Sequence, residues 1–307
     1  MKQILLLVFL LTCSLFIHAS GPSLNFEEIS PGIFVHQGEH LDVDEAYQGD
    51  IANIGFIVGE KAIAVIDTGG SLAIGKELKN AIRKISKLPI RYVINTHVHL
   101  DHIYGNAIFK EDDIDFIGHV ELPRAMASRK GFYERTNLKY LKIPLKKSIQ
   151  IAPNILIKPN ESESFDLGNR VIKVTGYPVS HTNTDVTVED IKTKTLWAGD
   201  LLFIERTPVI DGDIHGFIAV IDEILKLDID QVIPGHGTPT KKWKQAFLKE
   251  QNYFKVLRDE LRLAIDNDQD LQLTIDTAGR SESKKWELFN VQNGRNINKI
   301  FPIMEWE

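Results

Sequence analysis

Cysteine is nearly absent from this sequence of 307 residues, whose single cysteine is Cys13. That residue lies in an apolar N-terminal stretch that we expect to be removed, so the mature chain would carry no thiol and no disulfide. The fold must then depend on its hydrophobic core and on any ligand that it binds.

A surplus of basic residues is also missing. The chain has 36 lysines and arginines against 42 aspartates and glutamates, a formal net charge of -6. No cluster of lysine and arginine is interleaved with aromatic residues, so a nucleic-acid partner is not expected. With 43% hydrophobic and 25% charged residues and no low-complexity linker, the sequence predicts one folded domain over residues 21–307, with a C-terminal helix and tail from about residue 241.

No apolar run is long enough to span a membrane. The longest, Ile4 to Ile17, is broken by Thr12, Cys13 and Ser14 and is followed by the small residues of positions 19–21. A charged start, a short apolar run and a small-residue stretch are typical of a cleaved secretory signal, which we assign to residues 1–20. We therefore expect a periplasmic or secreted protein with no stable membrane insertion after cleavage; an uncleaved anchor is the alternative.

Three histidines and an aspartate fall within six residues, His97-Val98-His99-Leu100-Asp101-His102. The preceding stretch, Ile90 to Thr96, is rich in β-branched and aromatic residues and is typical of a strand. In near-extended backbone, side chains two residues apart point the same way, so His97 and His99 can converge on one ion. Asp101 and His102 diverge from that pair and suit a second ion nearby.

The segments before this motif indicate an α/β fold. A strand over Ala62 to Ile66 is followed by Asp67-Thr68-Gly69-Gly70, and Ser71 can cap a helix that runs to about Lys87. The next strand ends at His97. This strand, helix and strand order predicts parallel strands, and ligands of α/β proteins gather at the carboxyl ends of such strands.

Three further candidate ligands each follow an apolar strand. His181 comes after the strand over residues 170–175, Asp200 follows Trp197-Ala198-Gly199 at an expected strand end, and His236 lies in Pro234-Gly235-His236-Gly237. The glycines at 199 and 235 permit sharp turns that aim these side chains over the sheet edge.

Seven nitrogen or oxygen ligands imply two ions. The natural partition places His97, His99 and His181 around the first ion and Asp101, His102 and His236 around the second, with Asp200 bridging both. Imidazole and carboxylate ligands suit Zn²⁺, and iron or manganese would also bind. A metal-bridging hydroxide would then be the nucleophile, with Asp101 as a candidate proton relay.

These motifs resemble the metallo-β-lactamase superfamily: the His-x-His-x-Asp-His motif, then His181, Asp200 in Gly-Asp-Leu and His236 in Pro-Gly-His-Gly. The resemblance implies a four-layer αβ/βα sandwich, an α/β (α+β) fold, and a dinuclear zinc hydrolase. It also implies that Asp67 supports the metal-binding loop without binding metal. The strings over residues 49–56, 95–102 and 117–119 are similar to the exported quinoprotein relay system zinc metallohydrolases.

The substrate is expected to be a small molecule with an ester, lactone, lactam or phosphoester bond. The family's true β-lactamases usually carry cysteine or serine where this chain has Asp200. This difference disfavours a class B-like β-lactamase, which is kept as the alternative. An iron-dependent oxidoreductase on the same scaffold and a binding module without catalysis are two more. His119 and Tyr104 are candidates to line the substrate pocket. The sequence does not indicate an oligomeric state.

Other segments have simpler interpretations. Residues 121–135 and Trp243 to Asp266 predict helices, the second with one apolar side. Residues 137–165 show no regular pattern, and residues 267–307 are expected to form a polar tail that contains Trp286, Phe301 and Trp306. His36 is expected to be a solvated loop residue.

Overall fold

The computed structural model describes residues 24–44, 46–144 and 149–307. The expected signal segment, residues 1–20, lies outside this range, so that assignment and the export that follows from it stay predictions. In the described part of the chain, no helix is both long and apolar enough to cross a bilayer.

The first sheet has seven strands in sequence order, antiparallel from β1 to β4 and parallel from β4 to β7. The strands are β1 (Glu27–Ser30), β2 (Ile33–His36), β3 (Ile54–Val58), β4 (Ile63–Ile66), β5 (Ile90–Ile94), β6 (Asp115–His119) and β7 (Ile155–Ile157). The parallel pairing of β4 with β5 around the helix between them is the arrangement that the sequence predicts.

The second sheet has five strands in the order β12-β11-β10-β9-β8, and only β11 and β12 are parallel. The strands are β8 (Ser162–Asp166), β9 (Val171–Gly176), β10 (Val186–Asp190), β11 (Thr195–Phe203) and β12 (Gln231–His236). Strand β12 lies at the edge, where Pro234 is tolerated because an edge strand can lack one backbone donor.

Seven α-helices and two short 3-10 turns complete the described part. They are α1 (Leu72–Ile85), α2 (Leu100–Ile103), η1 (Asn106–Phe109), α3 (Leu122–Tyr140), α4 (Ile214–Ile224), α5 (Trp243–Asp266), α6 (Leu271–Thr277), η3 (Arg280–Glu282) and α7 (Phe289–Met304). The Ser71 hydroxyl accepts a hydrogen bond from the Ile74 amide, as the expected N-cap of α1. Helix α5 has the predicted bounds, and α3 runs five residues beyond its predicted end.

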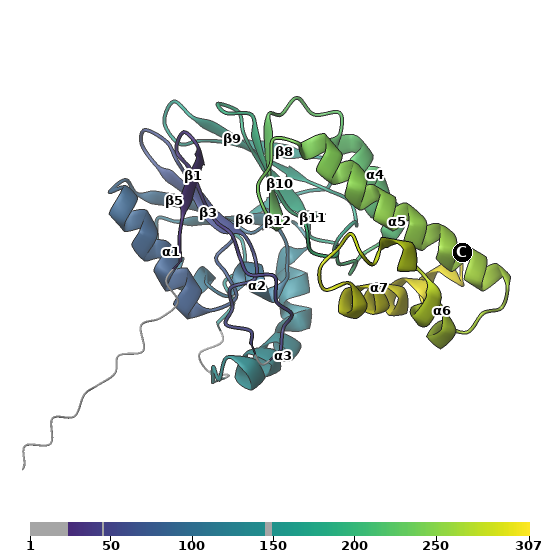
Figure 1. Ribbon diagram of the computed structural model, residues 1–307. Helices are drawn as coiled ribbons and strands as arrows, with labels where there is room; N and C mark the ends of the chain where they lie inside the picture. The colour runs from purple at the N-terminus through teal and green to yellow at the C-terminus, as the bar shows by residue number, and fades with distance from the viewer. Residues whose placement is uncertain (1–23, 45, 145–148) are drawn as a thin grey trace, which may run out of the picture.

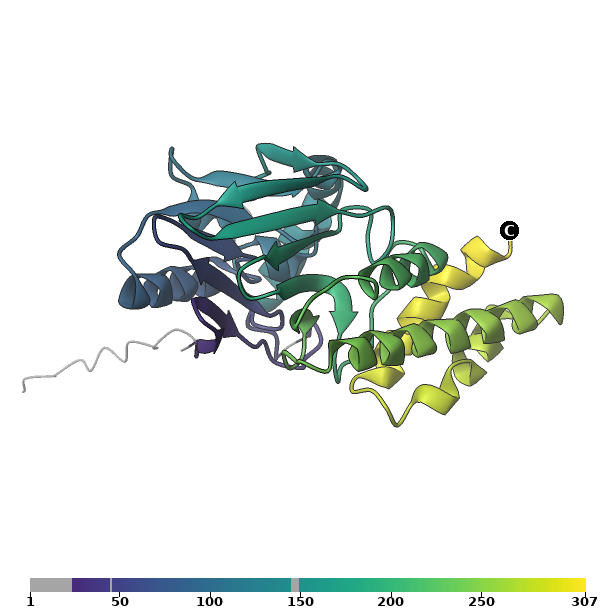
Figure 2. The ribbon, with the colours of Figure 1, turned by 90° about the horizontal axis from the view of Figure 1, so that it is seen from above.

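The layers follow from the alternation of side chains along each strand. In β4, Val65 packs with α1 and Ala64 packs between the two sheets. In β11, Trp197 lies between the sheets and Ala198 packs under α4 and α5. Figures 1 and 2 show α1 and α5 on opposite outer sides of the paired sheets. The fold is therefore the expected αβ/βα sandwich.

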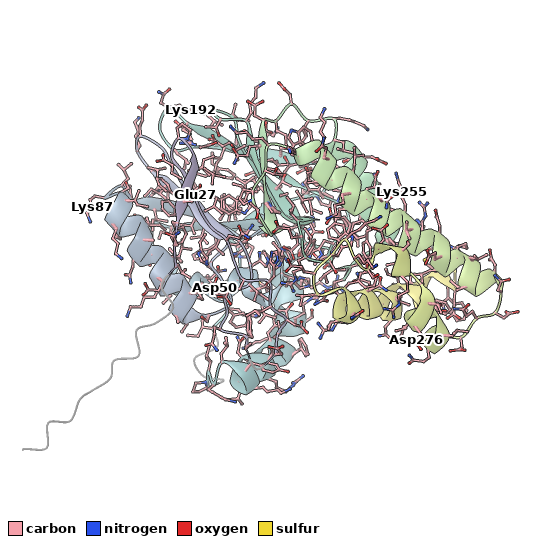
Figure 3. All side chains as sticks on the ribbon, in the orientation of Figure 1. Glu27, Asp50, Lys87, Lys192, Lys255 and Asp276 are labelled. Atoms are coloured by element: carbon pink, nitrogen blue, oxygen red, sulfur yellow. The ribbon has the colours of Figure 1, made fainter. Side chains whose placement is uncertain are left out.

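Figure 3 shows side chains filling the space between these layers. The labelled side chains of Lys87, Lys192, Lys255 and Asp276 point outward from the periphery, as expected for charged residues that remain in water.

The predicted polar tail is wrong. Residues 267–307 form α6, η3 and α7, and α7 contacts both α5 and α6. Trp286 and Phe301 are only 6% and 4% exposed in the core cluster around α4 and α5, whereas Trp306 is 92% exposed. The apolar residues of this segment meet their partners only in the folded chain, so local sequence polarity did not reveal them.

Candidate metal centre

The predicted ligands come from five places along one edge of the sandwich. The His-x-His-x-Asp-His motif spans the loop after β5 and the short helix α2, which begins at Leu100. His181 lies between β9 and β10, and His236 ends β12. Asp200 lies within β11, which continues to Phe203, so its predicted place at a strand end is wrong.

The first ligand group is His97, His99, His181 and Asp200. The Nε2 atoms of His97 and His181 lie 3.5 and 3.3 Å from Asp200 Oδ2. His99 faces the group with Nδ1, which is 3.0 Å from His181 Nε2. Ligand atoms at such separations can surround one ion.

The second group is Asp101, His102 and His236. Asp101 Oδ2 lies 3.5 Å from His102 Nε2 and 3.4 Å from His236 Nε2. Asp200 also reaches this group, with Oδ1 3.3 Å from His102 Nε2 and Oδ2 3.3 Å from His236 Nε2. One carboxylate thus touches both groups, as a bridging ligand must, and the two groups follow the predicted partition.

Each imidazole has an acceptor on the ring nitrogen that points away from the centre. The acceptors are Thr96 Oγ1 for His97 (3.1 Å), Asp211 Oδ2 for His99 (3.0 Å), Asp67 Oδ2 for His102 (2.8 Å), the Val209 carbonyl for His181 (2.8 Å) and the Ile51 carbonyl for His236 (2.6 Å). Such partners fix the tautomer in which the outer nitrogen carries the proton. The inner nitrogens of all five histidines are then lone-pair donors.

The centre also contains polar atoms that the protein itself leaves without hydrogen bonds. Within the described residues, His97 Nε2, His102 Nε2 and Asp200 Oδ1 are buried and have no hydrogen-bond partner. Buried polar atoms rarely remain unsatisfied. Unpartnered imidazole nitrogens and a carboxylate oxygen that face one another fit a divalent cation of the zinc type.

The charges of this cluster act on one another strongly. Burial disfavours the charged form of Asp200, but the neighbouring His236, His102 and His97 overcome this effect and hold its pKa well below the usual value. Burial, with the positive charge of His102 beside it, lowers the pKa of His97 well below the usual value. Ionised carboxylate and neutral imidazole are the forms that bind metal.

Asp67 contacts the loop that carries the His-x-His-x-Asp-His motif, and its role as support of a metal site stays a prediction. Its carboxylate accepts from the Thr96 amide at 2.8 Å, from the Thr96 hydroxyl at 2.7 Å and from His102 Nδ1 at 2.8 Å. Asp67 has φ +53, a left-handed conformation that aspartate tolerates better than most residues. Its fully buried side chain thereby contacts Thr96 and the outer nitrogen of His102, and it is in neither ligand group.

Asp211 is a site residue that the sequence did not reveal. Its carboxylate accepts from His99 Nε2 at 3.0 Å and from Arg129 Nη1 of α3 at 2.6 Å. Ion pairing with these groups holds the Asp211 pKa far below its usual value despite burial. Residue 211 lies in a loop without a periodic pattern, so only the folded chain shows that it meets His99.

Two more buried polar residues hold ligand-bearing loops. The Asn53 amide group donates to the Pro234 and Gly237 carbonyls at 2.9 and 2.7 Å, on either side of His236. The Asp185 carboxylate accepts from the Ser180 hydroxyl at 2.7 Å and from the Thr182 amide at 2.8 Å, which encloses the backbone of His181. Short polar residues beside strand ends were the available signal for both.

The two predicted turn glycines act in different ways. Gly199 has φ +55 and interrupts the pairing of β11 with β12, so it provides the expected local bend. Gly235 has no positive φ; a Cβ atom there would lie 1.9 Å from Asp200 Oδ1. Its role is therefore close approach to the bridging carboxylate and not a sharp turn.

Of the pocket candidates, His119 ends β6 and is 2% exposed, and Tyr104 is 3% exposed and packs against Tyr133. Neither is among the residues that line the two cavities described next. Their predicted contact with substrate stays a prediction.

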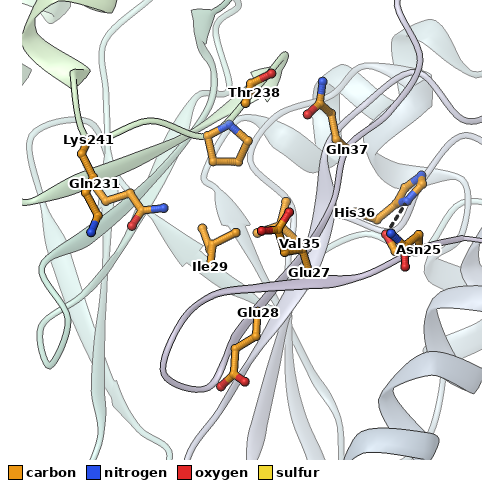
Figure 4. A pocket seen from close by; sticks show the side chains of 11 residues that line it. Asn25, Glu27, Glu28, Ile29, Val35, His36, Gln37, Gln231, Thr238 and Lys241 are labelled. Carbon is orange, nitrogen blue, oxygen red and sulfur yellow. Dashed lines mark hydrogen bonds between the residues drawn. The ribbon is translucent and has the colours of Figure 1, made fainter.

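One cavity, of about 570 Å³, lies away from the metal ligands, between β1, β2 and the segment from Gln231 to Lys241 (Figure 4). His36 lines it, and the interpretation of that residue as a solvated loop histidine is wrong. It ends β2 at 9% exposure, with Nε2 2.8 Å from Asp50 Oδ1 and Nδ1 3.0 Å from the Asn25 carbonyl.

The other cavity, of about 600 Å³, adjoins the metal-binding motif through Leu100. It is enclosed by the loop that carries Asp42 and Val43, by helix α3 and by Arg295 of α7. None of the seven candidate ligands is among its lining residues, and its size is in the range of small-molecule sites.

Comparison with known proteins identifies a family that agrees with the fold and with the candidate ligands. The model of the metallo-β-lactamase superfamily matches residues 47–236, which is more than half of the chain. The match contains every predicted ligand, from His97 to His236.

Solved structures of that fold resemble this one over three quarters of the chain or more. The stereoselective inverting sec-alkylsulfatase of a Pseudomonas species is 16% identical, with a TM-score of 0.72 over 91% of this chain and 50% of the sulfatase. Metallo-β-lactamases from Hirschia baltica and Pontibacter korlensis are 16% and 17% identical, with TM-scores of 0.59 and 0.56 over 76% and 75% of this chain and 98% and 99% of theirs. The chain spans about half the length of the sulfatase, and at these identities the likeness establishes the fold alone.

Proposed function

The chain belongs to the metallo-β-lactamase superfamily, and on that premise we propose that it is an exported dinuclear zinc hydrolase of a small-molecule substrate. One observation carries the proposal: two groups of ligand atoms meet at a single carboxylate, Asp200, whose oxygens lie within 3.5 Å of four imidazole nitrogens. Two closed tetrahedral sites would use eight separate protein ligands, whereas these two ions would share seven side chains, so that water could complete their coordination.

The residues of the centre would hold two divalent ions through their inner nitrogens and carboxylates. Burial disfavours the charged form of His102, but the charges of Asp200, Asp67 and Asp101 overcome burial and hold the pKa of His102 well above its usual value. This imidazole would therefore release its proton as metal binds. The outward nitrogens of the five histidines are fixed by Thr96, Asp211, Asp67 and two backbone carbonyls. When bound, a pair of such ions lowers the pKa of water toward neutrality and polarises the bond under attack. Asp101, at the edge of the second group, is a candidate to pass a proton to the leaving group.

The candidate bonds for cleavage are those of an ester, a lactone, a lactam or a phosphoester. A sulfate ester is a further candidate because a sulfatase has the same fold. A β-lactamase is the second candidate, supported by the fold of the two β-lactamases compared above. The aspartate at position 200 favours the other hydrolases over it. The complete ligand set for two ions favours both over a mononuclear iron oxidoreductase. Membership of the quinoprotein relay group stays a prediction.

The test is a hydrolysis assay of the zinc-loaded protein on chromogenic esters, lactones, thioesters, lactams, phosphodiesters and sulfate esters. Asp200→Ala removes the shared ligand, so we expect at least a hundredfold loss of kcat/KM on whichever substrate is cleaved. His215→Ala is the control, because it removes an exposed histidine of α4 that is in neither ligand group. Equal activity of the two variants would contradict the proposal.

A further inference from the structure

The cavity beside the metal-binding motif has an apolar floor. Leu100 is buried in a hydrophobic cluster that includes residues of α3. Val43, which is half-buried, and Tyr140 pack against this cluster. Phe132 stands at the cavity with 61% of its surface exposed. An exposed aromatic residue over such a floor is a surface that an apolar ligand would cover.

The rim of the cavity is basic, in contrast to the whole chain, whose net charge is -6. Arg135, Lys139 and Arg295 line it, and Asp42 is the one acidic residue among its lining residues. Asp42 is fully engaged by Arg295, with two hydrogen bonds of 2.8 and 2.9 Å. No ion pair with a carboxylate is found for Arg135 in the described chain, so a positive charge remains at the rim.

Positive charge continues from the cavity toward the metal ligands through Arg206. This arginine is 4% exposed, its Nη1 lies 3.2 Å from His236 Nδ1, and its Nε has no hydrogen-bond partner among the described residues. A buried guanidinium without a carboxylate within ion-pair distance is costly unless an anion approaches it.

We propose that this cavity binds the substrate and that the substrate is a small organic anion with an apolar or aromatic body. The body would lie against Phe132, Leu100 and Tyr140, and the acidic group, a carboxylate, sulfate or phosphate, would face Arg135. This names the substrate class of the proposed hydrolase and rests on that function. Its binding step can be measured without turnover.

The test uses two dyes of the same aromatic framework, the anionic anilinonaphthalene sulfonate and the neutral phenylnaphthylamine, both followed by fluorescence on the zinc-loaded full chain. Arg135→Glu should raise the dissociation constant of the anionic dye at least tenfold and that of the neutral dye less than twofold. Arg124→Glu is the matched control, since Arg124 carries the same charge on the same helix, is not among the lining residues, and has an 87% exposed side chain. Thr136→Trp places a large side chain in the cavity and should raise the dissociation constants of both dyes.

An anionic dye that binds Arg135→Glu as well as it binds Arg124→Glu would overturn the proposal, as would equal losses for both dyes. Hydrolysis separates this result from the proposed function. If the panel shows no turnover, the hydrolase is contradicted while the dye constants still decide the ligand class. Arg135→Glu and the parent can also be compared on a neutral ester and on its anionic analogue. If both proteins cleave each substrate equally fast, the hydrolase stands and the anionic substrate class does not.

Discussion

At the scale of single residues, the candidate ligands were predictable, and of the residues that contact them only Asp67 was. His97, His181 and His236 each follow an apolar strand, and chemistry-bearing residues at such positions meet at one sheet edge. Asp211 carries no comparable signal, because its contact with His99 joins residues 112 apart in sequence. The sequence shows which side chains can bind metal; only tertiary structure shows which carboxylate orients each ring.

Glu250 is a residue of the core that the metal centre does not use. It is fully buried on α5, and its Oε1 accepts from the Phe203 amide at 2.9 Å while Oε2 has no partner in the described chain. Burial raises the pKa of Glu250 well above its usual 4.5. The folded protein therefore keeps this carboxyl group protonated at a pH at which the unfolded chain has lost the proton.

The consequence is a loss of stability with rising pH. Below about pH 4.5 both states are protonated, and above it the unfolded state ionises alone until the folded-state pKa is reached. Glu250→Gln keeps an oxygen for the Phe203 amide and cannot ionise. The unfolding free energy of the variant relative to the parent should therefore rise between pH 5 and pH 8, by up to about 1.4 kcal/mol per pH unit. Urea unfolding at four pH values checks this, and parallel profiles would refute it.

At the scale of elements, regular hydrophobic patterns succeeded and long-range packing did not. The βαβ unit from β4 to β5 and the amphipathic helix α5 were predicted because their apolar residues recur at strand and helix periods. The C-terminal helices α6 and α7 have weaker local patterns. Helix α7 is stabilised by contact with α5, and α6 by contact with α7. Strand β11 was predicted too short because Gly199 marks a bend inside the strand and not its end.

The aromatic residues of the C-terminal segment test whether it belongs to the core. Phe301→Ala should lower the unfolding free energy by about 3 to 5 kcal/mol, because it leaves a cavity under α5. Trp306→Ala should change it by less than about 0.5 kcal/mol, since that side chain is 92% exposed. Chemical denaturation of both variants measures the difference, and equal effects would show that the segment is a peripheral tail.

At the scale of the whole molecule, the sandwich places its ligands where two sheets present one common edge. The loop after β5 comes from the first sheet, and Asp200 and His236 come from β11 and β12 of the second. Neither sheet alone contains a complete ligand set. The central claim is that Asp200 joins two ions. An experiment on this claim therefore tests the fold and the function together.

That claim is tested most directly by elemental analysis of the purified full chain after equilibration with zinc and removal of the free metal. The account predicts two zinc ions per chain in the parent protein and about one in Asp200→Ala. A parent protein that retains one ion or none, or a variant that still retains two, would contradict the shared centre on which the account depends.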